Sequence, residues 1–152
     1  MIRIATANDI ESIYSLICNM EQKVLDKSEF EQIFIEQLSC HTKPFLVFEQ
    51  DKDILGALSL RIEYQLHHCA KIAEIMELSV NENNRSKGIG KALFDAACQN
   101  ARDDGCVQIE VCCNMLRTKA HHFYNREGMS NYHYKFSMDL QGQAVTNNKL
   151  GL

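Results

Sequence analysis

The 152-residue sequence lacks the features that mark several large classes of protein. No apolar run reaches the roughly 18–20 residues that a membrane-spanning helix needs. The first residues do not have the pattern of a signal peptide, so we expect a cytoplasmic protein. An excess of positive charge is also missing, because the formal net charge is −4 at pH 7. Neither nucleic acid nor a membrane is therefore an expected partner.

The seven cysteines do not form a C-x-x-C pair, and their number is odd. This pattern argues against a zinc site and against a disulfide framework, so we expect reduced thiols that pack as small apolar side chains. Linkers, repeats and low-complexity stretches are also missing. Apolar residues make up 45% of the chain and charged residues 24%, the balance of a globular protein. We expect one domain over residues 1–141 and a flexible tail over 142–152.

Hydrophobic periodicity predicts an α/β chain whose elements follow the order β-α-α-β-β-β-α-β-α-β. The predicted strands cover residues 2–5, 45–48, 54–60, 72–80, 107–113 and 132–140. The first predicted helix starts between Thr6 and Asp9, and the second starts at the capping box Ser28-x-x-Glu31. Two further helices are predicted over residues 89–104 and 119–127, each followed by a glycine.

The most informative segment is Arg85-Ser86-Lys87-Gly88-Ile89-Gly90, between the fourth strand and the third helix. A glycine-containing turn of this kind leaves backbone N–H groups at the positive end of a helix dipole, where they suit a phosphate or pyrophosphate. Arg85 and Lys87 add positive charge. The dinucleotide fingerprint fails because Leu93 replaces its third glycine, and the nucleotide P-loop fails because Arg85 and Ala92 stand at two of its required positions.

The remaining pattern, R-x-x-G-x-G, resembles the pyrophosphate loop of the GNAT superfamily of acetyl-CoA-dependent N-acetyltransferases. The resemblance implies the GNAT fold, a mixed and largely antiparallel twisted sheet of six to seven strands flanked by about four helices. It also implies that acetyl-CoA binds to Arg85, Ser86, Lys87, Gly88, Ile89, Gly90 and Lys91. Backbone groups of Leu78, Ser79 and Val80 are expected to pair with the acetyl and pantetheine amides as an added strand would.

A second resemblance to the superfamily covers Asn114 to Gly128, with the run A-x-x-F-Y ahead of the glycine. It places Asn114 against the pantetheine arm and Tyr124 beside the thioester sulfur. Coenzyme A leaves as a thiolate whose thiol has a pKa of about 8.5, and a phenol of pKa about 10 can give it a proton. We expect Phe123 to pack in the core, the usual place of an aromatic ring.

Two acidic residues, Glu74 and Glu77, lie on the predicted strand 72–80 and are candidates for the base that deprotonates the amine. Strand alternation places Glu74 on one face with Met76 and Glu77 on the other with Ile75. A β-bulge, typical of the superfamily near the middle of this strand, would change that phase. The resemblance matches Glu74 to the position of the general base, and apolar neighbours would raise its pKa. Glu77 is the second candidate.

Within the superfamily the chain most resembles the aminoalkylphosphonate N-acetyltransferases. The shared runs are Leu16-Ile17-Cys18, Leu66-His67-His68, Glu74-Ile75, Glu77-Leu78, Val80, Ala120-His121, Phe123-Tyr124, Arg126-Glu127-Gly128 and Phe136. An anionic acceptor needs local positive charge, for which the candidates are Arg61, Lys71, Arg117, Arg126, His67 and His68. That family's association with a divalent metal implies a site in which His67 or His68 joins Glu74, although adjacent histidines on a strand point apart.

Other functions are compatible with these motifs. The acceptor could be an amino sugar, a polyamine or an amino acid in place of an aminoalkylphosphonate. A sensor that binds acetyl-CoA without chemistry is the second class, and the presence of both Glu74 and Tyr124 speaks against it. Modification of a protein N-terminus is the third, but no partner-binding segment is visible. We expect a small-molecule acceptor and a monomer or homodimer.

Overall fold

The computed structural model describes residues 1–141, and the predicted tail at 142–152 lies outside the described residues. The chain divides into two compact units, Met1–Cys112 and Cys113–Leu152, and each is described by itself below. In the described part of the chain, no helix is long and apolar enough to cross a membrane.

The first unit is built on one sheet with the strand order β1-β2-β3-β4-β5. Its strands are β1 (Ile2–Ile4), β2 (Phe45–Gln50), β3 (Asp53–Gln65), β4 (Ala70–Val80) and β5 (Gln108–Val111). The first four strands are antiparallel to their neighbours, and β5 runs parallel to β4. The predicted α/β fold with a mixed, largely antiparallel sheet is confirmed.

The strand predicted at residues 132–140 is not formed, so the described sheet has five strands and not six or seven. The alternating apolar side chains that predicted this strand are between 69% and 93% exposed. They are Tyr132, Tyr134, Phe136, Met138 and Leu140. A strand needs a neighbouring strand for its backbone groups and a buried face for its side chains, and periodicity alone supplies neither.

Residues 1–141 form four α-helices, as predicted: α1 (Ile10–Glu21), α2 (Lys27–Leu38), α3 (Ile89–Asp103) and α4 (Thr118–Arg126). The predicted start of α2 at Ser28 is wrong. Asp26 caps the helix, because its carboxylate accepts a hydrogen bond from the backbone N–H of Glu29 at 2.8 Å. An aspartate two residues before the predicted cap therefore supplies the acceptor that a helix N-terminus requires.

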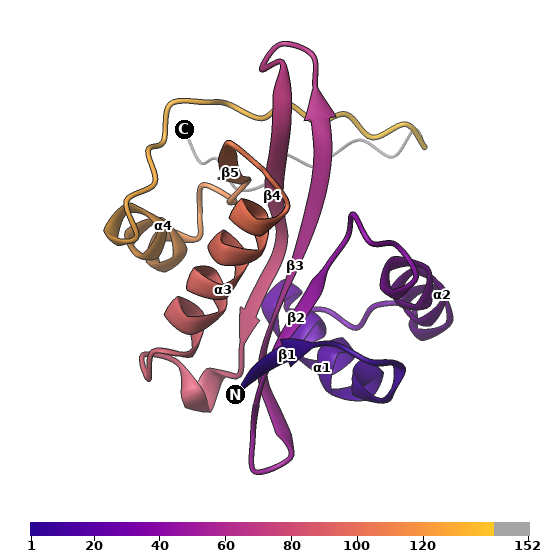
Figure 1. Ribbon diagram of the computed structural model, residues 1–152. Helices are drawn as coiled ribbons and strands as arrows, with labels where there is room; N and C mark the ends of the chain where they lie inside the picture. The colour runs from indigo at the N-terminus through magenta and orange to yellow at the C-terminus, as the bar shows by residue number, and fades with distance from the viewer. Residues whose placement is uncertain (142–152) are drawn as a thin grey trace, which may run out of the picture. The chain divides into compact units, whose positions relative to one another are not determined.

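Helices cover both faces of the sheet in the first unit. Figure 1 shows α1 and α2 on one side of the strands and α3 on the other. The face toward α1 carries a core that includes Ile13, Val47 and Ala57. On the same face, the buried Ser79 hydroxyl donates to the carbonyl of Leu16 at 2.9 Å and ties β4 to α1. Which face a β4 residue occupies therefore decides which helices surround its side chain.

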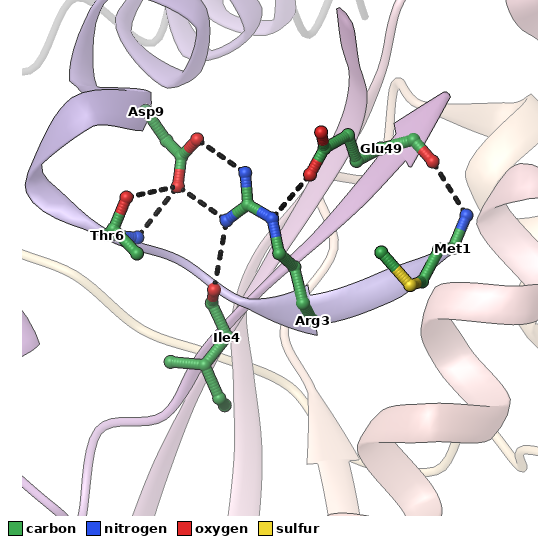
Figure 2. A network of polar contacts seen from close by, with 6 residues as sticks. All are labelled: Met1, Arg3, Ile4, Thr6, Asp9 and Glu49. Carbon is green, nitrogen blue, oxygen red and sulfur yellow. Dashed lines mark hydrogen bonds and ion pairs between the residues drawn. The ribbon is translucent and has the colours of Figure 1, made fainter. Parts of the chain in front are cut away.

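A polar network around Arg3 joins β1 to its neighbours (Figure 2). The guanidinium of Arg3 donates to both carboxylate oxygens of Asp9 at 2.8 Å and to Glu49 at 2.5 Å. Asp9 also accepts from the backbone N–H of Thr6 at 2.7 Å. The hydrogen bond from Arg3 is the main reason that the pKa of the buried Asp9 falls to about 2. This ion pair fixes the chain between β1 and α1.

Candidate active site

The loop predicted to bind pyrophosphate follows β4 and leads directly into α3. Ser86 and Gly88 have positive φ angles of 62° and 83°, and α3 begins at Ile89. Because the first N–H groups of a helix have no partner within it, those at the start of α3 remain available to a ligand. Residues 85–88 are exposed, including Arg85 and Lys87. The loop thus presents backbone donors and positive charge at one helix N-terminus, which is the chemistry of an anion site.

Gly56 holds the first turn of α3 close to the sheet. A Cβ atom at this position of β3 would lie 3.0 Å from side-chain atoms of both Ile89 and Leu93, and 3.2 Å from the carbonyl oxygen of Ser79. With any other residue at this position, the side chains of Ile89 and Leu93 or the backbone of Ser79 would have to move. The position of the anion-binding loop therefore also depends on Gly56 of β3, a residue outside the loop motif.

The strands β4 and β5 are paired over only part of their length. Ile72–Ile75 pairs in parallel with Gln108–Val111, whereas within Met1–Cys112 the segment Met76–Val80 pairs with β3 alone. The edge of Met76–Val80 that faces away from β3 thus has backbone groups without a strand partner in this unit. Such an edge can accept an extended ligand as an added strand. The sequence assigned this role to Leu78, Ser79 and Val80.

A β-bulge lies at the point where the two strands separate. Leu60 of β3 pairs with Ile75, but the preceding Ser59 pairs with Glu77, so Met76 is the extra residue. The predicted bulge is confirmed, and it reverses the phase of the strand beyond it. Glu77 shares a face with Ser59, while Ile75 lies on the opposite face, so the prediction that Glu77 and Ile75 share a face is wrong. Because Glu74 pairs with Arg61, two residues beyond Ser59, both glutamates lie on the α1 face.

The two glutamates have different surroundings. Burial raises the pKa of Glu77, a hydrogen bond donated by the Ser59 hydroxyl works against this, and the nearby charge of Glu21 raises the pKa further. Glu74 instead accepts a hydrogen bond from Arg61 Nη2 at 2.5 Å. The surroundings of Glu74 therefore include a cationic partner, which the sequence did not predict.

A small cavity of about 150 Å³ lies on the same part of the sheet. Its walls come from β3, from the bulge and from the C-terminal end of α2 with the loop that follows: Gln37, Lys43, Ser59, Leu60, Arg61 and Met76. A larger cavity of about 430 Å³ includes Asn100, Asp103 and Asp104. These residues stand at the far end of α3, about 20 Å along the helix from the anion-binding loop. The small cavity beside the bulge is therefore the better place for a reacting group.

The residues predicted to bind a metal do not come together. His67 and His68 lie in the turn between β3 and β4 and not on a strand, and their rings are 4.2 Å apart instead of pointing to opposite faces. His68 is 3.9 Å from Glu110, whereas Glu74 is bound by Arg61. Over residues 1–141, no group of three or more His, Cys, Asp or Glu side chains is arranged to hold a metal ion. None of the seven cysteines, all of which lie within residues 1–141, forms a disulfide.

The second unit contains the other predicted site residues. Asn114 organises the loop before α4: its side-chain oxygen accepts from the N–H of Leu116 at 2.9 Å, and its carbonyl accepts from the N–H of Arg117 at 2.9 Å. Burial is the main cause that raises the pKa of Tyr124, to about 12. The guanidinium of Arg126 lies over the ring of Phe123, 5.5 Å from its centroid. Tyr124 therefore stays a protonated phenol at neutral pH.

Sequence reasoning missed Ser59, Lys43 and Gln37. Ser59 was recognisable only as a polar residue in an apolar strand, and its partner Glu77 follows from the bulge. Lys43 and Gln37 come from α2 and the following loop and carry no motif at all. Their place beside Arg61 depends on how α2 packs against the sheet.

Comparison with known proteins agrees with this geometry. Residues 10–129 match the model of the Acetyltransferase (GNAT) family. The chain belongs to this family. As a GNAT protein it is an acyltransferase with acetyl-CoA as donor, the class that the loop at residues 85–90 predicted, which favours an enzyme over a sensor.

A curated relative of this GNAT protein is the aminoalkylphosphonate N-acetyltransferase of Salmonella typhimurium, which is 34% identical over 139 residues, or 91% of this chain and 90% of the relative. A transcriptional regulator from Bacillus halodurans C-125 has a TM-score of 0.85 at 22% identity, covering 91% of this chain and 98% of its own. The glucosamine-6-phosphate N-acetyltransferase of Arabidopsis thaliana has a TM-score of 0.77 at 24% identity, covering 92% and 97%. Likeness at this level of identity establishes the fold alone.

Proposed function

We propose that the protein transfers the acetyl group of acetyl-CoA directly to the primary amine of a small molecule, and that this acceptor is an aminoalkylphosphonate. The placement of Glu77 by the bulge, at the point where β4 leaves β5, carries the proposal. The bulge puts a half-buried carboxylate beside an open strand edge and next to Ser59, which lines the small cavity. The acceptor class is proposed from the 34% identical relative, because the name of that protein states the class.

In the proposed complex, the pyrophosphate of acetyl-CoA binds the N–H groups and cations of residues 85–91, and the pantetheine arm extends along Leu78–Val80. The arm supplies amide groups that pair with the open edge of β4. This arrangement directs the thioester toward the bulge, where Glu77 is located. Asn114 is assigned to the pantetheine arm by its position in the family motif.

Glu77 is proposed as the base. An alkylammonium has a pKa of about 10, so it must lose a proton before its nitrogen can attack. A half-buried carboxylate whose pKa is raised by its partial burial accepts that proton more readily near neutrality. The free amine then forms a bond to the thioester carbonyl carbon, the bond from carbon to sulfur breaks, and coenzyme A leaves as a thiolate. The nitrogen loses its second proton to solvent, which gives the neutral amide. Glu74, ranked first from the sequence, is the second candidate because its carboxylate is engaged by Arg61.

Tyr124 is proposed to stabilise the leaving thiolate. Full proton transfer from a phenol of pKa about 12 to a thiolate whose thiol has a pKa of about 8.5 is unfavourable by roughly 5 kcal/mol. A hydrogen bond from the phenol needs no such transfer and still lowers the energy of the departing sulfur. Tyr124 therefore acts first as a hydrogen-bond donor, and solvent protonates the thiolate after it has left.

The proposal is tested with acetyl-CoA and a panel of amines, by following release of coenzyme A and the mass of the product. The panel contains aminoalkylphosphonates, amino sugars, polyamines, amino acids and plain alkylamines. Parallel reactions with a chelator and with an added divalent cation test the metal that the family resemblance implied. Preferred acetylation of an amino sugar, a polyamine or a plain amine would contradict the proposed acceptor and leave the acetyltransferase assignment intact.

A further inference from the structure

The small cavity beside the bulge has two cationic side chains in its wall, Lys43 and Arg61. The loop that carries Lys43 is fixed to β3 on both sides. The carbonyl of Thr42 accepts from the N–H of Ile62 at 2.8 Å, and the carbonyl of Pro44 accepts from the N–H of Leu60 at 2.9 Å. These two backbone hydrogen bonds extend the sheet and hold Lys43 next to the strand segment that contains Arg61.

Arg61 does not use all its donors on protein groups. Its Nη2 atom donates to Glu74, but its Nε atom is buried and has no hydrogen-bond partner among residues 1–141. The carboxylate of Glu63 is 3.7 Å from Nε, outside hydrogen-bond range. A buried donor without an acceptor costs free energy, so the guanidinium of Arg61 is not fully satisfied by the protein. Arg61 also lies in the wall of the small cavity.

We infer that Lys43 and Arg61 bind the anionic group of a zwitterionic acceptor whose amine lies at Glu77. This inference rests on the proposed function and assigns the residues that select the acceptor. A guanidinium fork and an ammonium are the side chains that phosphonate, phosphate and carboxylate groups bind best. Neither Lys43 nor the pairing of these two residues follows from the family motifs.

The charges around the cavity favour a zwitterion over a simple anion or a simple amine. Glu63 and Glu74 face Arg61, and Glu77 lies next to Ser59 on the same face of the sheet. A simple anion would meet three carboxylates, and a simple amine would meet two cations. A zwitterion places its ammonium at Glu77 and its anionic group at Lys43 and Arg61. Each of its charges then lies next to a group of opposite charge.

The sheet also sets the length of the acceptor. Ser59, the partner of Glu77, and Arg61 are two residues apart on β3, which is about 7 Å along a strand. If the side chains of Glu77 and Arg61 bind one ligand across this separation, the amine and the acid of that ligand are joined by a short chain of one to three carbons. We expect the number of acceptor oxygens on the anionic group to decide whether Lys43 and Arg61 bind a phosphonate or a carboxylate more tightly.

The test compares three acceptors of similar length: aminoethylphosphonate, β-alanine and propylamine. Lys43→Met removes the charge and keeps most of the length of the side chain. It should raise KM for aminoethylphosphonate roughly ten- to hundredfold, the loss expected for a charge-assisted hydrogen bond, and leave KM for propylamine and for acetyl-CoA unchanged. Lys52→Met is the matched control, because Lys52 lies in the exposed turn at the other end of β3.

Arg61→Lys is a second test variant, and it remains informative if complete removal of the Arg61 side chain disrupts folding. It keeps the positive charge for Glu74 and loses the planar fork, so it should raise KM for both aminoethylphosphonate and β-alanine and leave KM for propylamine unchanged. The inference is overturned if Lys43→Met changes all three acceptors equally or none of them, or if the wild-type enzyme acetylates propylamine as well as the two zwitterions. A preference for β-alanine over the phosphonate would keep the anion site and correct the proposed acceptor. If no amine at all is acetylated, the proposed function fails before this site is in question.

Discussion

Glu74 and Glu77 lie on the same face of β4, where regular strand alternation would place them on opposite faces. The extra residue Met76 produces this arrangement, and the partner residues Arg61 and Ser59 on β3 give each carboxylate a different neighbour. Glu74 is thereby the ion-pair partner of Arg61, and Glu77 accepts a hydrogen bond from the Ser59 hydroxyl. Their chemical roles can be separated by experiment.

Glu77→Gln should lower kcat/KM by about 10²–10⁴ and remove the rise of rate with pH that the deprotonation of Glu77 causes. Because burial raises the pKa of Glu77 in the folded state, the ionised form favours unfolding, so the variant should also be more stable at pH 7. Glu74→Gln is the comparison and should keep the pH dependence. Rate profiles between pH 5 and 10 decide the matter: loss of the ionisation in Glu74→Gln alone would make Glu74 the base.

Tyr124→Phe should reduce turnover by about 10², near the lower end for acid–base groups, because the proposed role is a hydrogen bond and not proton transfer. Since the pKa of Tyr124 is about 12, the wild-type rate should not fall on the alkaline side below about pH 10. Binding of acetyl-CoA, measured by calorimetry, should be preserved. Unchanged turnover with every amine would show that the thiolate leaves without this phenol.

Gly88→Val should abolish most of the increase in melting temperature that acetyl-CoA causes in the wild type. Gly88 has φ of 83° at the cap of α3, so a β-branched residue distorts the N–H cradle. Gly105→Val is a matched control, because Gly105 has φ of 80° and also has open space around it, but it lies after the C-terminal end of α3. An acetyl-CoA shift retained in both variants would refute the loop assignment.

Gly56→Ala should destabilise the protein by about 1–3 kcal/mol, the usual cost of overpacking. The new methyl group would meet Ile89 and Leu93 at 3.0 Å and push the first turn of α3 away from β3. The same movement should raise KM for acetyl-CoA more than KM for the amine. Equal effects on both constants would mean that α3 does not transmit the change to the loop.

Asp9→Asn should lower the free energy of unfolding at pH 7 by about 2 kcal/mol. The pKa of Asp9 is about 2 in the folded protein against 3.8 ordinarily, so its contribution is complete above about pH 4 and disappears as the pH falls toward 2. Urea unfolding of wild type and variant should therefore differ at pH 7 and converge near pH 2. A difference that is constant over this range would exclude the ion pair with Arg3 as its source.

Sequence periodicity and local motifs predicted what depends on neighbouring residues. The four helices, the first five strands and the loop at residues 85–90 are of this kind. The start of α2 was misplaced because two capping residues, Asp26 and Ser28, compete over a single turn. The strand at residues 132–140 was misassigned because alternation gives a face but no partner strand.

The position of the reacting groups could be predicted only in part. The bulge was expected from the family, but its exact residue was not, and a shift by one position decides whether Glu77 points toward α1 or α3. Arg61 was one of several candidate cations, and its selection depends on its pairing with Glu74. Lys43 depends on the backbone hydrogen bonds of Thr42 and Pro44, which no local pattern encodes.

The parting of β4 from β5 has a consequence for handling and storage of the protein. The Met76–Val80 edge, open within Met1–Cys112, has backbone groups with which strands of other molecules can pair. Bound acetyl-CoA would occupy that edge and block the formation of a sheet between molecules. We therefore expect protein without bound acetyl-CoA to aggregate when it is concentrated. Coenzyme A added to the buffer should prevent this aggregation.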